Sequence, residues 1–573
     1  MKLTEGFDLL ATALGSVDRL RDLILSLAMQ GKLVAQDARE QPALHLLARL
    51  RDQKEELVKA GVVRRERAQL PIESEEVPFS IPAGWEWVRL CDMAWPQAGF
   101  AFKSTSFNES GLGLPLIRIR DVGGNNPSTF YSGEYREEFL VNAGDWLIGM
   151  DGDFRVAEWQ GGQALLNQRV TRLVFFLGDQ ELQRGFVCIA LQAELRKLQG
   201  KKAYTTVDHL SGGQIASRVI AVPPSAEQAR IVAKVDELMR LCNELESRGR
   251  LEAEQHARLT ETLFDALAAS ESAHALAENW SRVAANFDLL LDRPEAVDAL
   301  ERTVLQLAVR GLLVSADKND EPVDVLLEHI REEKSCKIAA RKANGGKTRT
   351  GILEEERPFE TPTHWTWCPL SELTLMGPNN GFSPKPSPVD TGVRCLSLSA
   401  TTKGYFREDC FKFVDIPSAS AEQYLLKKGD LLIQRANSLD YVGMAAVYDM
   451  EDDRFMYPDL MMRLRVASKL NVHFVHMYLI SNFGRQYFKG KATGTQGTMP
   501  KINQGVVLNM PIPIPPAAEQ ARIVECVIEL RGLCASLRAR LTDRQSCQAR
   551  LAEVLVEQAS AAGPDEGRLA LAA

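Results

Sequence analysis

The sequence has little of what marks several classes of protein. It contains 10 cysteines in 573 residues and no Cys-x-x-Cys pair, which disfavours a zinc ribbon and a thioredoxin-type redox site. No run approaches the roughly 18 apolar residues that cross a bilayer. The segment from Met1 to Leu20 lacks the basic and apolar parts of a secretion signal. We therefore expect a cytoplasmic protein whose cysteines are reduced, and neither a membrane protein nor a secreted one.

Positive charge is not in excess either. The chain has 68 Lys and Arg against 76 Asp and Glu, a net charge of −8, so a wholly basic nucleic-acid coat is excluded. Local basic patches can still bind nucleic acid, and the negative remainder can face protein partners. The 573 residues exceed the roughly 250–300 that one core supports, so two to four domains are expected.

Motifs of catalysis are absent as well. The chain has no His-Glu-x-x-His, no Gly-x-Ser-x-Gly and no Asn/Asp-Pro-Pro-aromatic motif of an amino-methyltransferase. Residues Asn344–Thr348 resemble the end of a phosphate-binding loop, but Arg341 stands where its first glycine belongs. His473 and His476 are interpreted as members of a packed or surface helix rather than as a metal pair. We therefore predict a chain with no catalytic residues, no metal and no cofactor of its own.

What the sequence does contain is a tandem duplication. Residues 7–37 match residues 287–317 at an offset of 280 (287 − 7). A second block repeats the motif Pro-Pro-x-Ala-Glu-Gln-Ala-Arg-Ile-Val, once after Val222 and again after Ile514, at an offset of 292 (514 − 222). Similar frames therefore enclose dissimilar inserts, which indicates a pseudo-two-fold molecule with two different specificities. We call residues 91–222 the first insert and residues 371–514 the second insert.

The second repeated block is predicted to be a long helix. Ile231, Val235, Leu238 and Cys242 follow one another in steps of four and three, and the same spacing recurs from Ile523. This seam is typical of a coiled coil, and because one seam cannot bury itself, the other copy is its expected partner. About 44 residues give a rod of roughly 65 Å. Ser225 and Gln228 predict a capping box at its start. Cys242 and Cys534 hold equivalent seam positions, either as small apolar residues or as a regulatory disulfide.

The rest of the chain alternates helical and strand-like segments. The first block predicts a helix that ends at Gly31, and at Gly311 in the second copy, followed by helices over 44–59 and 323–342. The inserts have short strand-like runs bounded by Gly, Pro and Asn, with helical stretches over 181–198 and 473–490, which gives an α+β class. The predicted domains are an N-terminal helical block (1–80), a first recognition domain (81–222), a central long helix (223–270), a second helical block and linker (271–357), a second recognition domain (358–514) and a C-terminal long helix and tail (515–573).

Any nucleic-acid surface must be a patch on the inserts. The first insert has 13 Lys and Arg against 14 Asp and Glu, and the second has 16 against 13, so neither is strongly basic. Lysines, hydroxyls and amides suit phosphate oxygens, whereas Arg pairs with guanine and Asn or Gln with adenine. A structural hydrogen bond or an ordinary solvated loop is the alternative at each position. The candidate DNA-binding residues are Lys103, Arg118, Arg120, Arg155, Asn167, Gln168, Arg169, Lys201, Lys202, Tyr204, Thr205, Lys385, Gln434, Arg435, Asn437, Ser438, Lys489, Lys491, Thr493, Gln496 and Lys501.

In this order, the motifs resemble a known family. The segments Gln30–Asp37, Gly84–Leu90, Leu165–Val170 and Gly429–Arg435, with the doubled Pro-Pro-x-Ala-Glu-Gln-Ala-Arg-Ile-Val, resemble the specificity subunit of type I restriction–modification enzymes. The resemblance covers nearly the whole chain. Each motif is weak alone, but the doubled series is highly specific.

The resemblance implies a fold and a role. It implies two α/β target recognition domains, each reading one half of a bipartite asymmetric DNA site, joined by two long antiparallel coiled-coil helices whose length sets the gap. It also implies a non-catalytic subunit that binds double-stranded DNA and two methyltransferase (modification) subunits, which carry S-adenosylmethionine and methylate adenine N6. Restriction/translocase subunits would join that core.

Three other interpretations stay open at this point. The chain could serve a methylation-only or other phage-defence system, in which the binding is the same and the partners differ. It could be a coiled-coil scaffold whose inserts bind protein, which sequence-selective, salt-sensitive DNA binding would argue against. It could also be an enzyme with an unrecognised site, which turnover by the isolated chain would reveal.

Overall fold

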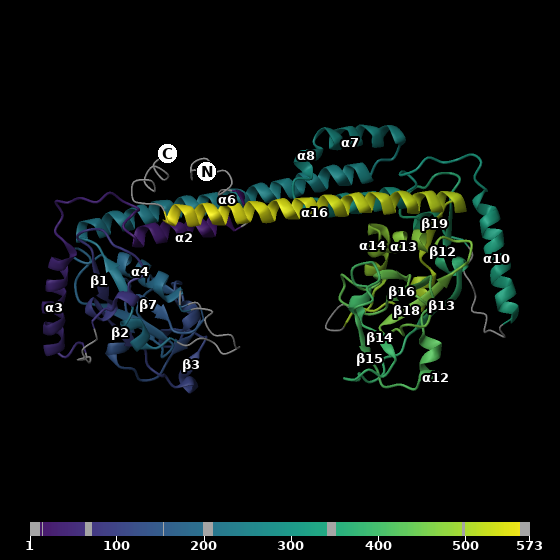
Figure 1. Cartoon of the computed structure of the whole chain (residues 1–573). Helices are drawn as coiled ribbons and strands as arrows, with labels where there is room; N and C mark the ends of the chain where they lie inside the picture. The colour runs from purple at the N-terminus through teal and green to yellow at the C-terminus, as the bar shows by residue number, and fades with distance from the viewer. Residues whose placement is uncertain are drawn as a thin grey trace. The chain divides into compact units, whose positions relative to one another are not determined.

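The computed structural model describes residues 12–13, 15–63, 71–152, 154–196, 198, 210–340, 351–494 and 499–561. The chain divides into two compact units, of which the first is Met1–Glu252 with Gln545–Ala573 and the second is Ala253–Arg544. Each unit mixes helices and strands (Figure 1). Two long helices, α6 (Ser225–Ala268) and α16 (Ala517–Ala561), each contribute one part to either unit.

The first unit contains an antiparallel four-stranded sheet of order β2-β10-β7-β8 and a five-stranded sheet of order β3-β5-β4-β9-β6, in which β4 and β9 are parallel. Strands β1 and β11 pair separately and join the two ends of the first insert. Besides its part of the long helices, the unit has helices α2 (Ser16–Met29), α3 (Ala43–Lys59), α4 (Arg184–Arg196) and α5 (Gly212–Ala216), and strands β1 (Glu86–Arg89), β2 (Ala94–Ala98), β3 (Phe107–Asn108), β4 (Leu114–Ile117), β5 (Phe130–Tyr131), β6 (Leu140–Val141), β7 (Trp146–Gly149), β8 (Val156–Glu158), β9 (Ala164–Leu166), β10 (Val170–Phe175) and β11 (Val219–Val222).

The second unit contains a four-stranded sheet of order β13-β18-β16-β17 and the separate pairs β12-β19 and β14-β15. Its helices are α7 (Ala273–Ala285), α8 (Phe287–Leu290), α9 (Pro294–Val309), α10 (Val323–Ala340), α11 (Leu370–Leu373), α12 (Ser418–Ala421), α13 (Val472–Ile480), α14 (Asn482–Lys491) and α15 (Gln504–Leu508). Its strands are β12 (Thr366–Pro369), β13 (Thr374–Asn380), β14 (Arg394–Leu396), β15 (Phe411–Phe413), β16 (Asp430–Gln434), β17 (Ala445–Tyr448), β18 (Met461–Val466) and β19 (Pro511–Ile514).

The four-stranded sheets of the two inserts share one topology although the insert sequences differ. Each four-stranded sheet has the same order of corresponding strands, and an arginine on the second strand in that order, Arg172 on β10 or Arg463 on β18, lies opposite Leu147 or Leu432. The guanidinium group of each arginine donates to two backbone carbonyls at 2.5–3.2 Å. The acceptors are Leu140 and Glu138 in the first insert, and Leu425 and Gln423 in the second. The duplication therefore extends through the inserts as structure.

The predicted helix ends at the two glycines are confirmed. Helix α2 stops at Met29 and α9 at Val309, and the glycine two residues later has φ of 68° at Gly31 and 73° at Gly311. A Cβ atom at Gly31 would lie 2.5 Å from Pro82 Cγ, and one at Gly311 would lie 2.7 Å from Pro362 Cγ. Both the left-handed backbone and the proline therefore require glycine.

The seam of each long helix is covered differently from the prediction. Ile231, Val235 and Cys242 of α6 share a buried cluster with α2 and with Ala552 and Leu555 of α16. In the second unit, α16 buries its seam residues against α9 in two clusters. One cluster includes Val304 of α9 and the other includes Val297. The two long helices share part of these clusters, and the prediction that each buries the other's seam is not confirmed. Periodicity reveals an apolar stripe but not which element covers it, and here the helix of the first repeated block does so.

Polar pairs fix the same helix contacts. Arg21 of α2 donates to Glu246 of α6 at 2.6 Å, and at the equivalent positions Glu301 of α9 accepts from Arg538 of α16 at 3.3 Å. The repeat offsets of 280 and 292 relate these two pairs, so the duplicated contact carries its charges in reversed order. Cys242 and Cys534 are free and lie in different clusters, so the disulfide alternative is not observed.

The start of each long helix is held by the repeated Ala-Glu-Gln. The buried Glu227 accepts from Trp85 Nε1 at 3.0 Å, and Glu519 accepts from Trp365 Nε1 at 3.1 Å. Gln228 Oε1 accepts from Gln183 N, as Gln520 Oε1 does from Asn471 N.

The predicted capping box does not form. Ser225 is already the first helical residue, and its hydroxyl donates to the carbonyl of Glu181 at 2.7 Å. Gln228 is occupied by Pro223 O and Gln183 N. Tertiary partners replace the local cap because α6 begins next to the segment that precedes α4. Backbone groups of that segment, Glu181 O and Gln183 N, need hydrogen-bond partners.

The helices of the inserts differ from the prediction in their bounds. The stretch 473–490 is two helices, α13 and α14, because Ser481 leaves the helical conformation and its hydroxyl caps α14 at Gly484 N. The stretch 181–198 narrows to Arg184–Arg196. Residues 344–348 lie outside the described residues.

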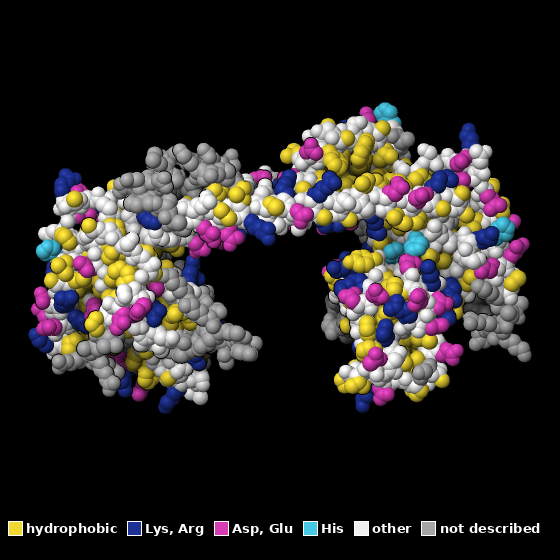
Figure 2. Space-filling view, viewed as in Figure 1, with side chains coloured by type: hydrophobic (Ala, Val, Ile, Leu, Met, Phe, Trp, Pro, Cys, Tyr) yellow, Lys and Arg dark blue, Asp and Glu magenta, His cyan; other side chains and the backbone are white. Residues whose placement is uncertain are grey.

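Helices α7 and α8 border an exposed apolar groove in the second unit. Trp280 of α7 is 48% exposed and Leu533 of α16 is 67% exposed, and both line a hollow of about 480 Å³. Figure 2 shows hydrophobic side chains gathered over this part of the unit. No described helix is long and apolar enough to cross a membrane.

Candidate nucleic-acid interface

The candidate residues of the second insert gather around the loop that follows β16, residues 435–441. Arg435 O accepts from Ile502 N at 2.9 Å, and Asn437 N donates to Pro500 O at 3.3 Å. Lys501, between these partners, pairs with Thr493 through both backbone hydrogen bonds at 2.9 Å. The structure therefore brings Arg435, Asn437, Thr493 and Lys501, which are scattered over 67 positions of sequence, into one surface.

Two residues of α14 hold the far end of this loop. Lys489 Nζ lies 3.0 Å from Asp440 Oδ1, and Arg485 Nη2 donates to Asp440 O at 2.8 Å. Burial lowers the pKa of Arg485 from its ordinary value. The candidate Lys489 is thus engaged with a carboxylate.

Four candidate cations of the second insert stay uncompensated. Lys385, Arg435, Lys491 and Lys501 form no ion pair within the part of the chain that the structure describes. Arg435 is half-buried and the three lysines are exposed. Such cations are available to phosphate or base oxygens.

Gln434 is placed where it cannot contact a base. The prediction counted it among the readers, but its side chain is 0% exposed. Its Nε2 donates to Leu398 O and to the hydroxyls of Thr401 and Thr402. Its Oε1 accepts from Asn437 Nδ2 at 2.6 Å. The reason is tertiary, since the end of β16 lies beneath the turn formed by η7 (Leu398–Ala400).

The candidate residues of the first insert lie on three loops that meet. Met150 N donates to Arg169 O, and Arg169 Nη1 forms an ion pair with Asp151 Oδ2 at 2.8 Å. The guanidinium group of Arg155 packs over Gly123, where a Cβ atom would lie 2.5 Å from Arg155 Cζ. The loops 118–124, 150–155 and 167–169 therefore form one surface.

The exposed cations of this surface differ in their engagement. Arg118 and Arg155 form no ion pair within the described residues, whereas Arg169 does. Arg120 donates to Ser128 Oγ and Thr129 Oγ1 at 3.2 Å and lies 3.9 Å from Asp121. Gln168 is exposed beside Arg169.

Asn167 has a structural environment. It is 9% exposed, its Oδ1 accepts from Gln168 N at 2.8 Å, and its backbone bridges to Phe100. A Cβ atom at Gly99 would lie 2.1 Å from Asn167 O, so the two segments touch through backbone. The geometry favours a turn-forming role over the base contact that the sequence predicts.

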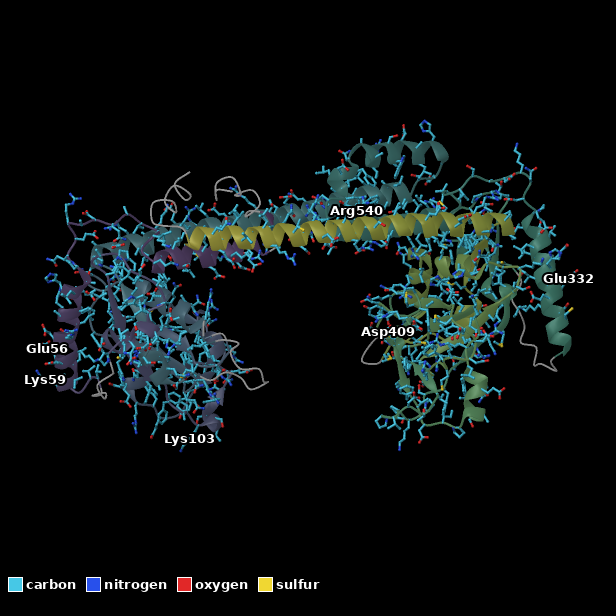
Figure 3. All side chains as sticks on the ribbon, in the orientation of Figure 1. Glu56, Lys59, Lys103, Glu332, Asp409 and Arg540 are labelled. Carbon is cyan, nitrogen blue, oxygen red and sulfur yellow. The ribbon has the colours of Figure 1, made fainter. Side chains whose placement is uncertain are left out.

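Other candidates lie apart from these surfaces or outside the described residues. Lys103 is exposed, and Figure 3 shows it at the end of the first insert away from α6. Lys201, Lys202, Tyr204, Thr205 and Gln496 fall outside the described residues. Leu210, just after the first of those segments, donates its N–H to Met150 O, as Ile502 does to Arg435 O. Leu210 and Ile502 therefore each lie beside a candidate loop.

The prediction missed the residues that support the loops. Thr401, Thr402 and Arg485 contact the 435–441 loop or its base, but they lie 32 to 45 positions from the residues that they contact, and none belongs to a recognisable motif. Only the repeated topology could have indicated that the turn after β14 meets the end of β16.

The described residues can be compared with the groupings that hold a metal ion. No cluster of three or more His, Cys, Asp or Glu side chains occurs among them. His476 is buried with its Nε2 3.1 Å from Ala445 O, and burial lowers its pKa to about 4. His473 instead faces Asp449 at 3.6 Å, so the two histidines do not form a pair of ligands.

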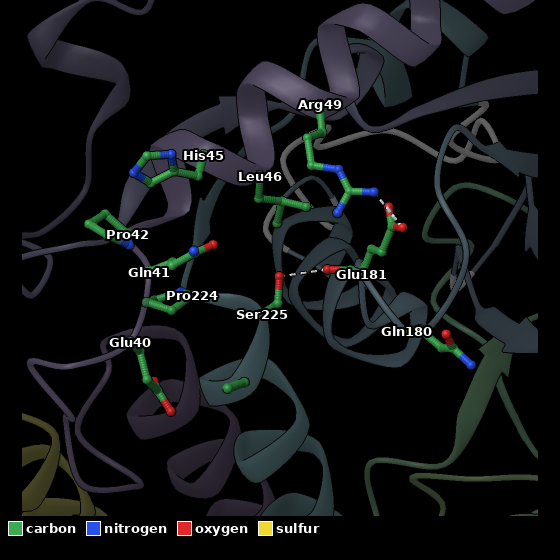
Figure 4. A pocket seen from close by; sticks show the side chains of 11 residues that line it. Glu40, Gln41, Pro42, His45, Leu46, Arg49, Gln180, Glu181, Pro224 and Ser225 are labelled. Carbon is green, nitrogen blue, oxygen red and sulfur yellow. Dashed lines mark hydrogen bonds and ion pairs between the residues drawn. The ribbon is translucent and has the colours of Figure 1, made fainter.

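A polar hollow of about 350 Å³ lies in the first unit between α3, the segment before α4 and the start of α6 (Figure 4). Several of its polar groups are hydrogen-bonded to one another. Arg49 pairs with Glu181 at 2.5 Å, and Ser225 donates to Glu181 O.

Comparison with known proteins identifies the family. Residues 82–255 and 400–540 match the family model of the type I restriction modification DNA specificity domain. The chain is 29% identical over 571 residues to the type I restriction enzyme EcoEI specificity subunit of Escherichia coli, covering 95% of this chain and 94% of that one. It is also 29% identical over 576 residues to the EcoAI specificity subunit of Escherichia coli, with the same coverage.

A solved structure is also similar in part. It is a chain described in terms of complex assembly and conformational transition of the type I R-M system, matched at 16% identity with a TM-score of 0.47 over 84% of this chain and 99% of that one. The family match covers the first insert, the second insert from residue 400 onward and the first part of each long helix. The chain belongs to the family of type I restriction–modification DNA specificity subunits.

Proposed function

We propose that the chain recognises a bipartite, asymmetric DNA site and that each insert reads one half of it. One observation carries this proposal. The two inserts share a strand order and an arginine anchor, yet their exposed loops present different side chains. A shared frame with different contact residues suits two half-sites of different sequence.

The contact residues divide by chemistry. Arg118, Arg155 and Gln168 of the first insert and Arg435 and Ser438 of the second are the proposed base readers. The proposed phosphate contacts, which position each domain without reading sequence, are lysines and threonines among the candidate residues: Lys103, Lys201, Lys202, Thr205, Lys385, Lys491, Thr493 and Lys501. Uncompensated charge on several of these residues supports this division.

The long helices are proposed to space the two recognition domains as an antiparallel pair. Helix α6 has 44 residues and α16 has 45, which corresponds to roughly 65 Å each. The end of α16 joins the apolar cluster of the first unit, and Phe264 and Leu267 of α6 join a cluster of the second. Half-sites on one face of B-DNA recur about every 34–36 Å, a gap that such a spacer can bridge.

The partners follow from the family. We propose that the chain acts without catalysis of its own in the cytoplasm, directing N6-adenine methylation by two methyltransferase subunits and restriction by further subunits. The helical blocks within 1–80 and 271–357 and the groove beside Trp280 are the surfaces proposed to meet protein partners. Residues 81–222 and 358–514 are proposed to be the two recognition domains. Residues 223–270 are proposed to be the central long helix, and residues 515–573 the C-terminal long helix and tail.

Mapping methylated adenines tests this function. DNA from cells carrying the chain and its neighbouring methyltransferase is sequenced for N6-methyladenine, with cells lacking the chain as the control. The expected result is one motif made of two different defined halves separated by a gap of fixed length. A continuous motif, or methylation that is unaffected by loss of the chain, would contradict the proposal.

A further inference from the structure

A chain of hydrogen bonds connects two loops of the second insert through Gln434. On one side, Nε2 of Gln434 lies 2.9 Å from both Leu398 O and Thr401 Oγ1 and 3.2 Å from Thr402 Oγ1. On the other side, Asn437 Nδ2 donates to Gln434 Oε1 at 2.6 Å. Asn437 Oδ1 then accepts from Ser438 N at 2.7 Å. The turn at η7 is thereby connected to the backbone of the 435–441 loop.

Burial makes this connection restrictive. Gln434 and Thr401 are 0% exposed, so water cannot replace a lost partner there. A buried polar group without a partner costs about 1–3 kcal/mol, so the amide is held in one orientation. With the donor side fixed by η7, the acceptor side dictates where Asn437 lies.

The ends of the loop are held independently of Gln434. Ile502 N donates to Arg435 O, and Arg485 and Lys489 both bind Asp440. Loss of the Gln434 side chain would therefore loosen the centre of the loop, which keeps the backbone hydrogen bond from Asn437 N to Pro500 O at 3.3 Å, while its ends stay attached. The side chains whose positions would change are those of Arg435, Asn437 and Ser438, which lie at the proposed base-reading surface.

We propose that Gln434 is a positioning residue that sets the base preference of the second insert without touching DNA. This rests on the proposed function, because the preference belongs to the half-site that the second insert reads. Base readout tolerates displacements of only about 0.5 Å, so a loosened loop centre loses discrimination before it loses affinity. Phosphate contacts from Lys385, Lys491 and Lys501 lie outside the hydrogen-bond chain and keep sequence-independent binding.

The central experiment compares Gln434→Met with a matched control. Gln520 is also 0% exposed, and its amide donates to Pro515 O and accepts from Asn471 N, but it lies at the start of α16. Gln520→Met therefore removes equally buried amide hydrogen bonds away from the 435–441 loop. Each variant is assembled with the methyltransferase subunits, and affinities are measured for DNA with the wild-type motif and with single substitutions in either half.

The expected result is confined to one half-site. In Gln434→Met, discrimination against substitutions in the second insert's half falls roughly five- to hundredfold, the range that one base contact supplies. Discrimination in the other half and the salt dependence of binding stay within about twofold of the wild type. Gln520→Met lowers thermal stability but leaves both halves unchanged. Equal loss of discrimination in both variants would reduce Gln434 to a general stabilising residue and overturn the proposal.

Milder variants cover the case in which Gln434→Met does not fold. Thr401→Val and Thr402→Val each remove one acceptor and leave the amide in place, and together they are expected to reproduce a smaller loss in the same half. Unchanged discrimination in the folded double variant would overturn the positioning role. A wild-type chain without a divided motif would instead contradict the proposed function itself, so the two failures are distinguishable.

Discussion

The two inserts share a contact between a turn and the end of a strand, but they form it with different side chains. The turn after β4, η4 (Ile119–Asp121), meets the end of β7 by close packing, and a Cβ atom at Gly149 would lie 3.1 Å from Ile119 Cγ1. The corresponding turn η7 meets the end of β16 through the amide of Gln434. Strand pairing relates Gly149 to Gln434, because each lies two residues beyond the leucine opposite the anchoring arginine. The frame therefore specifies that turn and strand meet, but not the chemistry of their contact.

This difference teaches where specificity can change. The arginine anchors bind backbone carbonyls, which every residue type offers, so substitutions in the loops leave the frame intact. The turn–strand contact depends on side chains, and it differs between the inserts.

The largest effect is expected when the two inserts are made identical. A chain in which the second insert, 371–514, replaces the first, 91–222, would carry the same reader twice. Because β1-β11 and β12-β19 close the two inserts in the same manner, the graft is expected to fold. Adenine methylation mapping should then show a motif with two copies of the second half-site. Retention of the original first half would contradict the assignment of one half to each insert.

The next largest effect is a difference between the two inserts in how their stability depends on pH. Phe186 and Phe474 make the same edge contact with Trp85 and Trp365, which aligns His476 with Cys188. Burial lowers the pKa of His476 to about 4, so the unfolded chain binds the extra proton first as the pH falls below about 6.5. Stability is thus fully present above that pH and declines towards pH 4, where the loss reaches about 3 kcal/mol.

Hydrogen exchange between pH 7 and 5 provides the measurement. Amides of β16 and β17 should lose about 2 kcal/mol of protection at pH 5 relative to pH 7 because of His476. In His476→Cys, which copies the first insert, this part of the pH dependence should disappear. The strands β7 and β10 of the first insert provide an internal control. Identical pH profiles in wild type and variant would exclude His476 as the cause.

A smaller effect is expected from giving the first insert the second insert's residue. Gly149→Gln introduces a side chain against Ile119, and overpacking of this kind costs about 1–3 kcal/mol. Thermal unfolding measures the cost, and Gly149→Gln combined with Ile119→Ala should recover part of it. Gly162→Gln is the control because nothing lies within 4 Å of a Cβ atom there, and its effect should stay within about 0.5 kcal/mol. Equal costs at both glycines would show that the turn does not press on β7.

The sequence predicts the duplicated elements well because their signals are local. The offsets of 280 and 292 located both frames, and Gly31 and Gly311 mark helix ends because a left-handed residue is needed there. The 44 residues of α6 follow from its unbroken apolar period.

Where a tertiary partner decides, the sequence is silent. An apolar stripe on α6 does not reveal that α2 rather than α16 covers most of it. Ser225 has the residue type of a cap, yet a carbonyl from before α4 engages its hydroxyl. Gln434 and Asn167 have the side chains of base readers, but burial beneath a turn or beside Gly99 removes them from the surface. The loop residues that remain exposed, such as Arg118 and Arg155, could be predicted because charge without a local partner belongs at a surface.

The reversed charges at α2 and α9 disfavour an exchange of partners during folding, in which each helix would pack on the long helix of the other half. Arg21 faces Glu246 in the first unit, whereas Glu301 faces Arg538 in the second. If α2 were to settle on α16, or α9 on α6, arginine would meet arginine and glutamate would meet glutamate. Each exposed pair contributes only about 0.2–1 kcal/mol, but replacing attraction by repulsion at both sites penalises the exchanged arrangement twice. Two related segments can thus share one chain and still assemble in a single way.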